Sequence, residues 1–382
     1  MMSKKYLIIF ILSCLLLAGC WDSNENERMY YAFGAGVDYQ EGEYIISLQI
    51  ISFTNVAKTE QVNQEVIQSQ VSSDKGKTID EAFFKLYHAI DERVYWGHFS
   101  FLVFTKEALN NGRIKSVINS ITRFNDTRYN TWVYCTDEPL DQLLNVLPLL
   151  KKSITLTKIA DPLNSFEQES FIEPIDVRKL IIKMNEPSYE ANIPFIKLKK
   201  DWQTQNEPLS TAEIRGVGVV TPKEFKGIIE GDDAKGLQWM SNETIRGEIT
   251  TSYEKNKHLS ASIQNVKVNI VPIVKDKDVK FDINIDLTAS LSSFEGNLTT
   301  DVIKEQVIKA ISKEIKQTYK AGIEMNVDIF RFSEILYRKD VNTWKELHKD
   351  GKIKLDENSI GNININIKKL TTGRKSFIDT IQ

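Results

Sequence analysis

One cysteine of this chain has a setting that favours covalent modification. Lys4 and Lys5 precede an apolar run, Tyr6–Ala18, which is too short to span a bilayer comfortably and has the length of a secretory signal core. The run ends in Leu17-Ala-Gly-Cys20, where small residues let the chain enter a peptidase cleft. The sequence therefore predicts a signal peptide over residues 1–19. Its removal leaves Cys20 as the new N-terminus, with a thiol that diacylglycerol would modify as a thioether and an amine open to N-acylation.

Leu17-Ala-Gly-Cys20 resembles a bacterial lipobox, and this changes the expected location of the chain. Each buried CH₂ group contributes about 0.8 kcal/mol, so one acyl chain anchors a protein only marginally and two anchor it durably. We therefore expect the chain to be a lipoprotein that Cys20 holds on the extracytoplasmic face of a membrane. The mildly acidic body would not bind an anionic membrane by itself.

The other cysteines offer less chemistry. Cys14 leaves with the signal peptide, so Cys135 is the remaining thiol and has no partner for an intramolecular disulfide. It lies in a strand-like stretch, Thr131–Cys135, where a buried and inert thiol is the favoured interpretation. A nucleophilic role would need a nearby base, and the sequence identifies none.

Motifs for catalysis, cofactors and metals are lacking in the sequence. The pairs Gly34-Ala-Gly36 and Gly216-Val-Gly218 do not continue as a dinucleotide-binding fingerprint, so close backbone packing is expected there instead. The four histidines are scattered at positions 88, 98, 258 and 348, which does not favour a metal site. Adjacent acids occur at Asp137/Glu138, Asp232/Asp233 and Asp356/Glu357, and neighbours on a strand point in opposite directions. We expect no catalytic residue, no metal and no cofactor.

Composition excludes two broad classes of function. The 382 residues include 49 Lys and Arg against 52 Asp and Glu, a formal net charge of −3. A broad basic face for nucleic acid is therefore not expected, because phosphate contacts need clustered cations. The mean hydropathy of −0.30 and the lack of a long apolar run after the N-terminus exclude a polytopic membrane protein.

Three α+β domains are expected, each a mixed or antiparallel sheet with packed helices. The first, residues 20–136, has a predicted strand pair around a turn at Gln40–Gly42 and a strand near Glu65–Ser72. Thr78-Ile-Asp-Glu81 is a capping box that opens a helix. The aromatic-rich stretch Val94–Thr105 is strand-like, both of its faces look buried, and Trp96 within it is interpreted as core.

The second domain, residues 137–250, begins with a helix after Pro139, and Asp161–Ser170 is expected to be irregular. Asp176 can cap a further helix, strands are expected at Ile193–Lys199 and Ile214–Val220, and Gly231–Met240 is interpreted as a helix.

The third domain, residues 251–382, has the clearest periodicity. From Val279 to Leu291 apolar and polar residues alternate strictly, which predicts a long strand with one packed face. Between this strand and another at Ile363–Ile367, apolar residues recur every four positions from Ile303 to Ile315. This predicts a long amphipathic helix, about 300–323, across a largely antiparallel sheet.

Several motifs, in this order behind Leu17-Ala-Gly-Cys20, resemble one family. The chain is similar to the C-subunit lipoproteins of bacterial spore germinant receptors, the Ger(x)C family. The motifs that carry the resemblance are Gly19-Cys-Trp-Asp22, Glu27, Gly34-Ala-Gly-Val-Asp38, Thr78-Ile-Asp-Glu-Ala82, Tyr95-Trp-Gly-His98, Arg215-Gly-Val-Gly-Val-Val220, Lys226-Gly-Ile-Ile229, Gly236-Leu-Gln-Trp239, Arg246-Gly-Glu-Ile-Thr250, Glu295-Gly-Asn-Leu298, Asp328-Ile-Phe-Arg-Phe332 and Trp344. Arg331 departs from the pattern, because the resemblance implies a small residue there, often glycine.

The resemblance implies a non-enzymatic subunit that is lipid-anchored at the spore inner membrane. It implies assembly with two polytopic membrane subunits into a nutrient receptor, and a role in the response to nutrient germinants. Two alternatives stay open. A solute-binding lipoprotein would capture a nutrient directly in a concave site with convergent polar groups, and a tethered hydrolase of cortex peptidoglycan would need paired carboxylates in one cleft.

Overall fold

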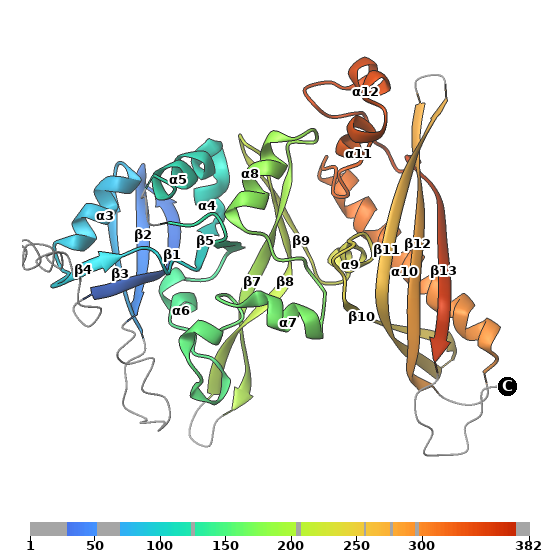
Figure 1. The fold of residues 1–382 in the computed structure, drawn as a ribbon, viewed down its shortest axis with the longest axis horizontal. Coiled ribbons are helices and arrows are strands. Elements are labelled where there is room, and N and C mark those ends of the chain that lie inside the picture. The colour runs from blue at the N-terminus through green and yellow to red at the C-terminus, as the bar shows by residue number, and fades with distance from the viewer. Residues whose placement is uncertain are drawn as a thin grey trace, which may run out of the picture.

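The strands of the chain form two sheets that lie side by side. The computed structural model describes residues 29–51, 69–123, 127–203, 208–255, 257–275, 278–294 and 298–371, and over these residues it has a nine-stranded and a four-stranded sheet. Figure 1 shows the first sheet with its helices on the left and centre, and the second on the right. The expectation of an α+β fold of sheets with packed helices is confirmed.

The first sheet has the order β3-β2-β1-β5-β6-β7-β8-β9, with β4 beside β1. Strands β1, β5, β6 and β7 run parallel to their neighbours in this order, and the outer pairs are antiparallel. The strand bounds are β1 (Met29–Gln40), β2 (Glu43–Ile51), β3 (Ser69–Gly76), β4 (Arg93–Tyr95), β5 (Phe101–Thr105), β6 (Trp132–Thr136), β7 (Ala191–Gln203), β8 (Pro208–Val220) and β9 (Phe225–Glu230).

Helices cover both faces of this sheet. On one face lie α3 (Ile79–Tyr87), α4 (Lys106–Leu109), α5 (Arg113–Ile121) and α8 (Val177–Asn185), and on the other lies α6 (Leu140–Leu144). The central strand β5 is therefore buried on both sides, with Leu102 and Phe104 toward the first set of helices and Phe101 and Val103 toward α6. This confirms the expected burial of both faces, but the stretch Val94–Thr105 is not one strand, because β4 ends at Tyr95 and β5 begins at Phe101.

Local sequence signals set the helix starts as expected. The Thr78 hydroxyl accepts a hydrogen bond from the Glu81 amide (3.1 Å), and the Asp176 carboxylate accepts one from the Lys179 amide (2.6 Å). Each bond satisfies an amide that the first helical turn leaves without an intrahelical partner. Trp96 is buried, and its indole donates to the Tyr87 hydroxyl (3.0 Å), which confirms its place in the core.

The second sheet has the order β10-β11-β12-β13, with α10 across its apolar face. The alternation from Val279 to Leu291 is confirmed, since all seven apolar residues on that face are buried. The long helix is confirmed as well, because Ile303, Val307, Ile311 and Ile315 are fully buried. The bounds are β10 (Arg246–Glu254), β11 (Lys257–Lys275), β12 (Asp278–Phe294), α10 (Thr300–Glu324), α11 (Phe332–Lys339), α12 (Val341–Leu347) and β13 (Ile360–Thr371).

Several expectations for local structure were wrong. Asp161–Ser170 contains a helix, α7 (Pro162–Gln168), with Pro162 in its first turn, where a missing N–H costs nothing. The stretch Gly231–Met240 forms a short 3₁₀ turn, η5 (Gly231–Ala234), and a separate short helix, α9 (Gly236–Trp239). The expectation of a largely antiparallel second sheet is confirmed, since β10, β11 and β12 pair antiparallel and only β13 runs parallel to its neighbour β12 in this sheet. The strand expected near Glu65–Ser72 begins, among the described residues, at Ser69 and continues to Gly76.

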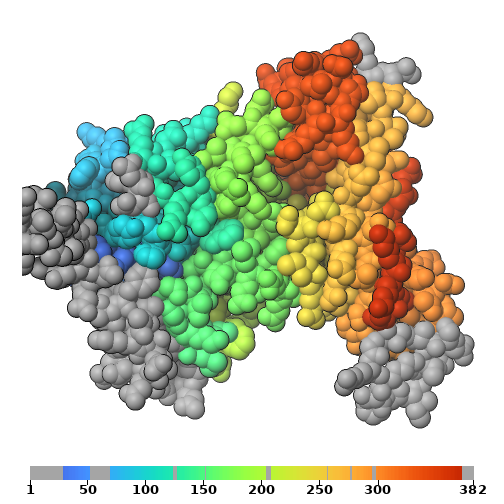
Figure 2. All heavy atoms as spheres, viewed as in Figure 1, coloured from blue at the N-terminus to red at the C-terminus, as the bar shows by residue number. Residues whose placement is uncertain are grey.

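The division into three domains stays a prediction. The described strands form two sheets, because β6 pairs with β7 at Cys135 and Phe195 and so joins the sheet across the expected boundary at residue 137. A shared sheet does not by itself define a folding unit, and stability can differ from one part of it to another. Figure 2 shows the two sheet regions in contact on the face drawn, where green atoms meet yellow and orange ones.

Candidate functional site

The predicted lipidation site, Cys20, lies outside the described residues, so the structure does not test it. The first described residue, Met29, begins β1 and packs against the hydrophobic cluster beneath α6. Any anchor at Cys20 therefore connects to the first sheet at the start of strand β1.

Cys135 is a buried thiol in strand β6. Its side chain is 1% exposed, and its Sγ atom lies 3.7 Å and 3.8 Å from the Ile193 and Pro194 carbonyl oxygens. Burial raises the pKa of the thiol to about 12, because the charged thiolate loses its hydration. The interpretation as a buried core residue is confirmed.

Cys135 is expected to resist thiol reagents in the folded protein. At pH 8 its raised pKa leaves a very small thiolate fraction, and the thiolate is the nucleophile. Mass spectrometry after iodoacetamide treatment of the mature chain should show no label on Cys135 under native conditions and full labelling in urea. Rapid labelling of the native protein would contradict the burial of this thiol.

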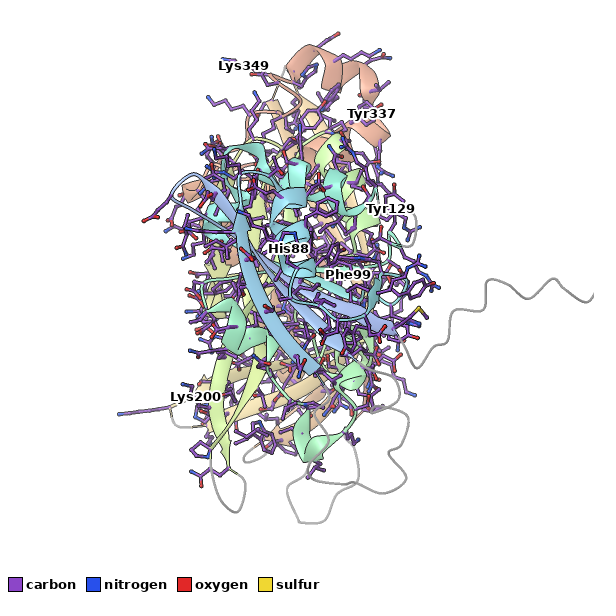
Figure 3. All side chains as sticks on the ribbon, turned by 90° about the vertical axis from the view of Figure 1, so that its left-hand side faces the viewer. His88, Phe99, Tyr129, Lys200, Tyr337 and Lys349 are labelled. Atoms are coloured by element: carbon purple, nitrogen blue, oxygen red, sulfur yellow. The ribbon has the colours of Figure 1, made fainter. Side chains whose placement is uncertain are left out.

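The histidines and adjacent acids do not come together as a catalytic or metal site. Figure 3 shows His88 at the end of α3 and Lys349, the residue after His348, near the top of the view. Among the described residues, no group of three or more His, Cys, Asp or Glu side chains is arranged to hold a metal ion. Two of the adjacent acids form ion pairs, Asp137 with Lys197 (3.3 Å) and Asp232 with Lys235 (2.7 Å).

The glycine pairs serve close packing, as expected. A Cβ atom on Gly34 would lie 2.2 Å from the Phe101 ring, and one on Gly218 would lie 2.5 Å from the Cys135 sulfur. A Cβ on Gly216 would lie 2.1 Å from the Ile229 carbonyl oxygen, in the backbone of the neighbouring strand β9. The side chains of other residue types do not fit at these positions.

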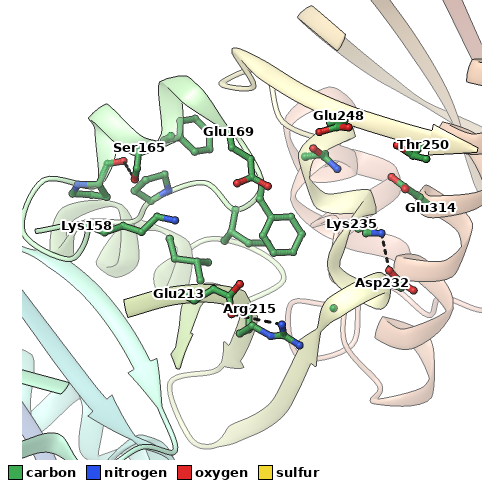
Figure 4. A pocket seen from close by; sticks show the side chains of 18 residues that line it. Lys158, Ser165, Glu169, Glu213, Arg215, Asp232, Lys235, Glu248, Thr250 and Glu314 are labelled. Carbon is green, nitrogen blue, oxygen red and sulfur yellow. Dashed lines mark hydrogen bonds and ion pairs between the residues drawn. The ribbon is translucent and has the colours of Figure 1, made fainter. Parts of the chain in front are cut away.

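A cleft of about 540 Å³ lies between the two sheets, and we name it the inter-sheet cleft. Figure 4 shows side chains from α7 and β8 on one side and from η5, β10 and α10 on the other. The charged residues that line it are Lys158, Glu169, Glu213, Arg215, Asp232, Lys235, Glu248 and Glu314. The described lining residues include no histidine and no cysteine.

Many of these charges are already paired or hydrogen-bonded. Arg215 contacts Glu213 (3.6 Å), and the Glu314 carboxylate accepts a hydrogen bond from the Trp239 indole (2.6 Å). Burial raises the pKa of Glu314, and the indole bond opposes this only in part. The cleft can contact charged groups of either sign.

A cluster of polar residues joins the two sheet regions, and we name it the Arg331 cluster: Lys183, Glu190, Asp328, Arg331, Glu334 and Lys352. Figure 1 shows the segment before α11 next to α8 of the first region. The Arg331 guanidinium donates to the carbonyl oxygens of Lys183 (3.2 Å), Pro187 (3.3 Å) and Glu190. It also pairs with the Glu334 carboxylate.

Two buried carboxylates complete this cluster. Asp328 accepts hydrogen bonds from the amides of Phe332 (2.7 Å) and Ser333 (2.8 Å), which begin α11. Glu190 accepts one from the Asp328 amide (2.8 Å) and pairs with Lys352. Burial raises the pKa of both carboxyls, while these contacts lower it in part.

The contacts of Arg331 explain why the chain can have an arginine where the family pattern implies a small residue. Its φ of 56° and ψ of 40° lie in the left-handed region, where glycine has no steric penalty. The turn is therefore of the kind that a small residue favours, and an arginine occupies it here. Its bonds to three carbonyls of the first region offset the cost of that conformation. Sequence reasoning identified the position but missed the contact, because the partners lie more than a hundred residues away.

Two family models match successive parts of the chain. The model described as spore germination protein N-terminal domain matches residues 22–198, and the model described as spore germination B3/GerAC like, C-terminal, matches residues 215–371. Together they span both sheets.

Curated relatives match this chain over nearly its whole length. Spore germination protein KC of Bacillus subtilis (strain 168) is 22% identical over 363 residues, which cover 89% of this chain and 88% of the relative. Spore germination protein B3 of the same organism is 20% identical over 373 residues, 93% of this chain and 96% of the relative.

A solved structure, described as the crystal structure of the GerBC protein, has the same fold with a TM-score of 0.55. It is 15% identical, and the match covers 88% of this chain and 96% of that one. The order of the two family matches, the relatives and this fold agree with the motifs in the sequence. The chain therefore belongs to the Ger(x)C family, the C-subunit family of spore germinant receptors.

Proposed function

We propose that this protein is a non-enzymatic, lipid-anchored subunit of a nutrient germinant receptor on the outer face of the spore inner membrane. It assembles there with two polytopic membrane subunits and is needed for the response to nutrient germinants. One observation carries the proposal: a complete pair of family matches follows Leu17-Ala-Gly-Cys20 directly.

The anchor has a simple physical role. No helix in the described part of the chain is both long and apolar enough to cross a bilayer. Two acyl chains on Cys20 would hold the protein at the surface durably. Confinement near the membrane raises the effective concentration of the partner subunits, so weak docking becomes stable assembly.

A non-enzymatic role is supported by the chemistry of the described residues. Asp137 and Asp232 are held in ion pairs, Cys135 is buried with a raised pKa, and several charges of the inter-sheet cleft have partners. We expect no saturable thermal stabilisation of the mature chain by amino acids or sugars, and such stabilisation would favour direct nutrient capture instead.

Replacing Cys20 by alanine tests the anchor. Spores that carry Cys20→Ala should lose at least about tenfold of this protein from the membrane fraction, because the acyl chains supply most of the membrane affinity. The polytopic subunits should no longer co-purify with it, and nutrient germination should fail.

Cys14→Ala is the matched control, since it removes a cysteine from the same apolar run without touching the cleavage motif. It should leave fractionation and germination unchanged. A Cys20→Ala protein that still co-purifies with the polytopic subunits and supports germination would refute the proposed anchor.

A further inference from the structure

Four leucines project into solvent from one short segment of the first region. The segment Leu147–Leu156, which we name the leucine loop, follows α6 and contains the 3₁₀ turns η3 (Leu149–Lys151) and η4 (Ile154–Leu156). The exposed fractions are 41% for Leu147, 37% for Leu149, 88% for Leu150 and 55% for Leu156. Single exposed leucines are common, but a cluster within ten residues marks an interaction surface.

The second half of the loop is tied to the body of the first region. Ile154 is buried in the cluster with α6, the Leu156 amide donates to the Ser153 carbonyl (2.9 Å), and the Thr157 hydroxyl donates to the Ile154 carbonyl (2.9 Å). Leu150 has a φ of 59°, a conformation with a steric cost for a bulky residue. Backbone strain of this kind clusters at binding sites, and Leu150 is the most exposed of the four leucines.

The loop is also basic. The sequence Leu149-Leu-Lys-Lys152 sets lysines beside the leucines, and the Lys152 side chain is exposed. No acidic residue occurs between Leu147 and Lys158. Leucines beside lysines match the boundary between acyl chains and headgroups, where apolar side chains bury and cations meet anionic lipids. A purely protein-binding patch would not require this excess of positive charge.

The loop lies at the end of the sheet where the anchor enters. Tyr31 of β1 pairs with Ile51 of β2, which pairs with Ser69 of β3. Ser69 lines a small pocket together with Asn145, just before the loop. Met29 packs in the same hydrophobic cluster as Leu144 and Ile154.

The covalent distance to the anchor is short. Cys20 precedes Met29 by only nine positions, a reach of at most about 30 Å even for a fully extended chain. An anchored Cys20 therefore keeps this end of the first sheet, and the leucine loop with it, close to the bilayer.

We propose that the leucine loop docks on the phospholipid bilayer that holds Cys20, with Leu149 and Leu150 in the headgroup–acyl boundary and Lys152 toward anionic headgroups. This proposal rests on the proposed lipid anchoring. It gives the body a fixed orientation, because the lipid and the loop are two separate contacts with one surface. The membrane then not only confines the protein to its surface but also orients both sheets toward the partner subunits.

Vesicle flotation of a chain that carries no lipid on residue 20 tests the contact of the loop by itself. Although the net charge of the chain does not favour binding to anionic membranes, the loop should supply such binding locally. Full-length mature chain made with Cys20→Ser should therefore float with vesicles of phosphatidylcholine and phosphatidylglycerol, less with phosphatidylcholine alone, and less at high salt. Leu149→Ser with Leu150→Ser should lower the bound fraction at least about tenfold, since two apolar side chains leave the bilayer. Lys152→Glu should weaken binding to the anionic vesicles only.

Phe84→Ser with Ile245→Ser is the matched control, because these side chains are 63% and 50% exposed elsewhere on the body. The control should float like the parent chain. An equal loss in both double variants would overturn the proposal, and so would a parent chain that binds no vesicles of either composition.

A second measurement uses the anchored protein. Leu150→Cys can carry an environment-sensitive dye selectively, because Cys135 is buried and Cys20 would be lipidated. In lipoprotein reconstituted into vesicles, dye emission at position 150 should shift to the blue, and emission from Phe84→Cys should not. An unshifted emission at 150 in protein whose lipidation mass spectrometry confirms would overturn the loop contact while leaving the anchor intact. Missing lipidation would refute the anchor instead.

Discussion

Asp328→Ala is expected to destabilise the protein by about 3 kcal/mol. The buried carboxylate accepts the amides of Phe332 and Ser333, and its removal leaves both amides buried without a partner. The same segment positions Arg331, so the contacts with the Lys183, Pro187 and Glu190 carbonyls should weaken too. Urea unfolding monitored by circular dichroism should show a clearly lower midpoint.

Two further variants make this result specific. Asp328→Asn keeps one acceptor oxygen and should lose about half as much stability. Asp278→Ala removes an exposed carboxylate from the start of β12 and should change stability by less than about 0.5 kcal/mol. A loss below about 1 kcal/mol in Asp328→Ala would show that this cluster does not hold the two regions together.

Gly216→Ala should cost about 3 kcal/mol or more, although it adds a single methyl group. Gly216 lies in β8 between β7 and β9, and its added Cβ would meet the Ile229 carbonyl oxygen at 2.1 Å. Backbone on both sides holds that oxygen in place, so relief requires the strands to separate. Thermal unfolding and the yield of folded protein should both fall.

Gly361→Ala is the matched comparison, because Gly361 is also a strand glycine with a near neighbour. There the closest atom is a carboxylate oxygen of Asp282, at the end of a side chain that can rotate. The expected loss is about 1 kcal/mol or less. Equal losses at the two positions would mean that rigid backbone contact is not what requires glycine at 216.

The elements with long, regular periods could be predicted from the sequence alone. The alternation from Val279 to Leu291 and the four-residue spacing from Ile303 to Ile315 placed β12 and α10 closely. Thr78 and Asp176 marked helix starts, because capping depends on neighbours only three residues away. Local chemistry suffices for such features.

Pairings between distant segments could not be predicted in the same way. The single bridge between Cys135 and Phe195 merges two expected sheets, and the parallel pairing of β13 with β12 depends on a connection that crosses α10. Strand β9 and helix α7 are too short for a periodic signal, with Leu163 of α7 exposed rather than buried. Their formation depends on neighbours that the sequence does not place.

The candidate sites divide along the same line. The lipidation site at Cys20 is predicted from four adjacent residues. The inter-sheet cleft and the Arg331 cluster could not be predicted in this way, because they assemble side chains from both regions. The leucine loop is an intermediate case, because it could be predicted only in part. Its leucines are plain in the sequence, but their exposure depends on where α6 ends, at Leu144, which leaves Leu147 in solvent.

Lipid attachment at Cys20 is the claim on which membrane location, assembly and the orientation by the leucine loop all depend. Intact-mass and peptide mass spectrometry of this protein, purified from spores in detergent, measures it directly. The expected N-terminal peptide begins at Cys20 and carries a diacylglyceryl thioether and an N-acyl group. A peptide that retains the bond between Gly19 and Cys20, or a mature N-terminus with an unmodified Cys20 sulfur, would contradict lipid anchoring.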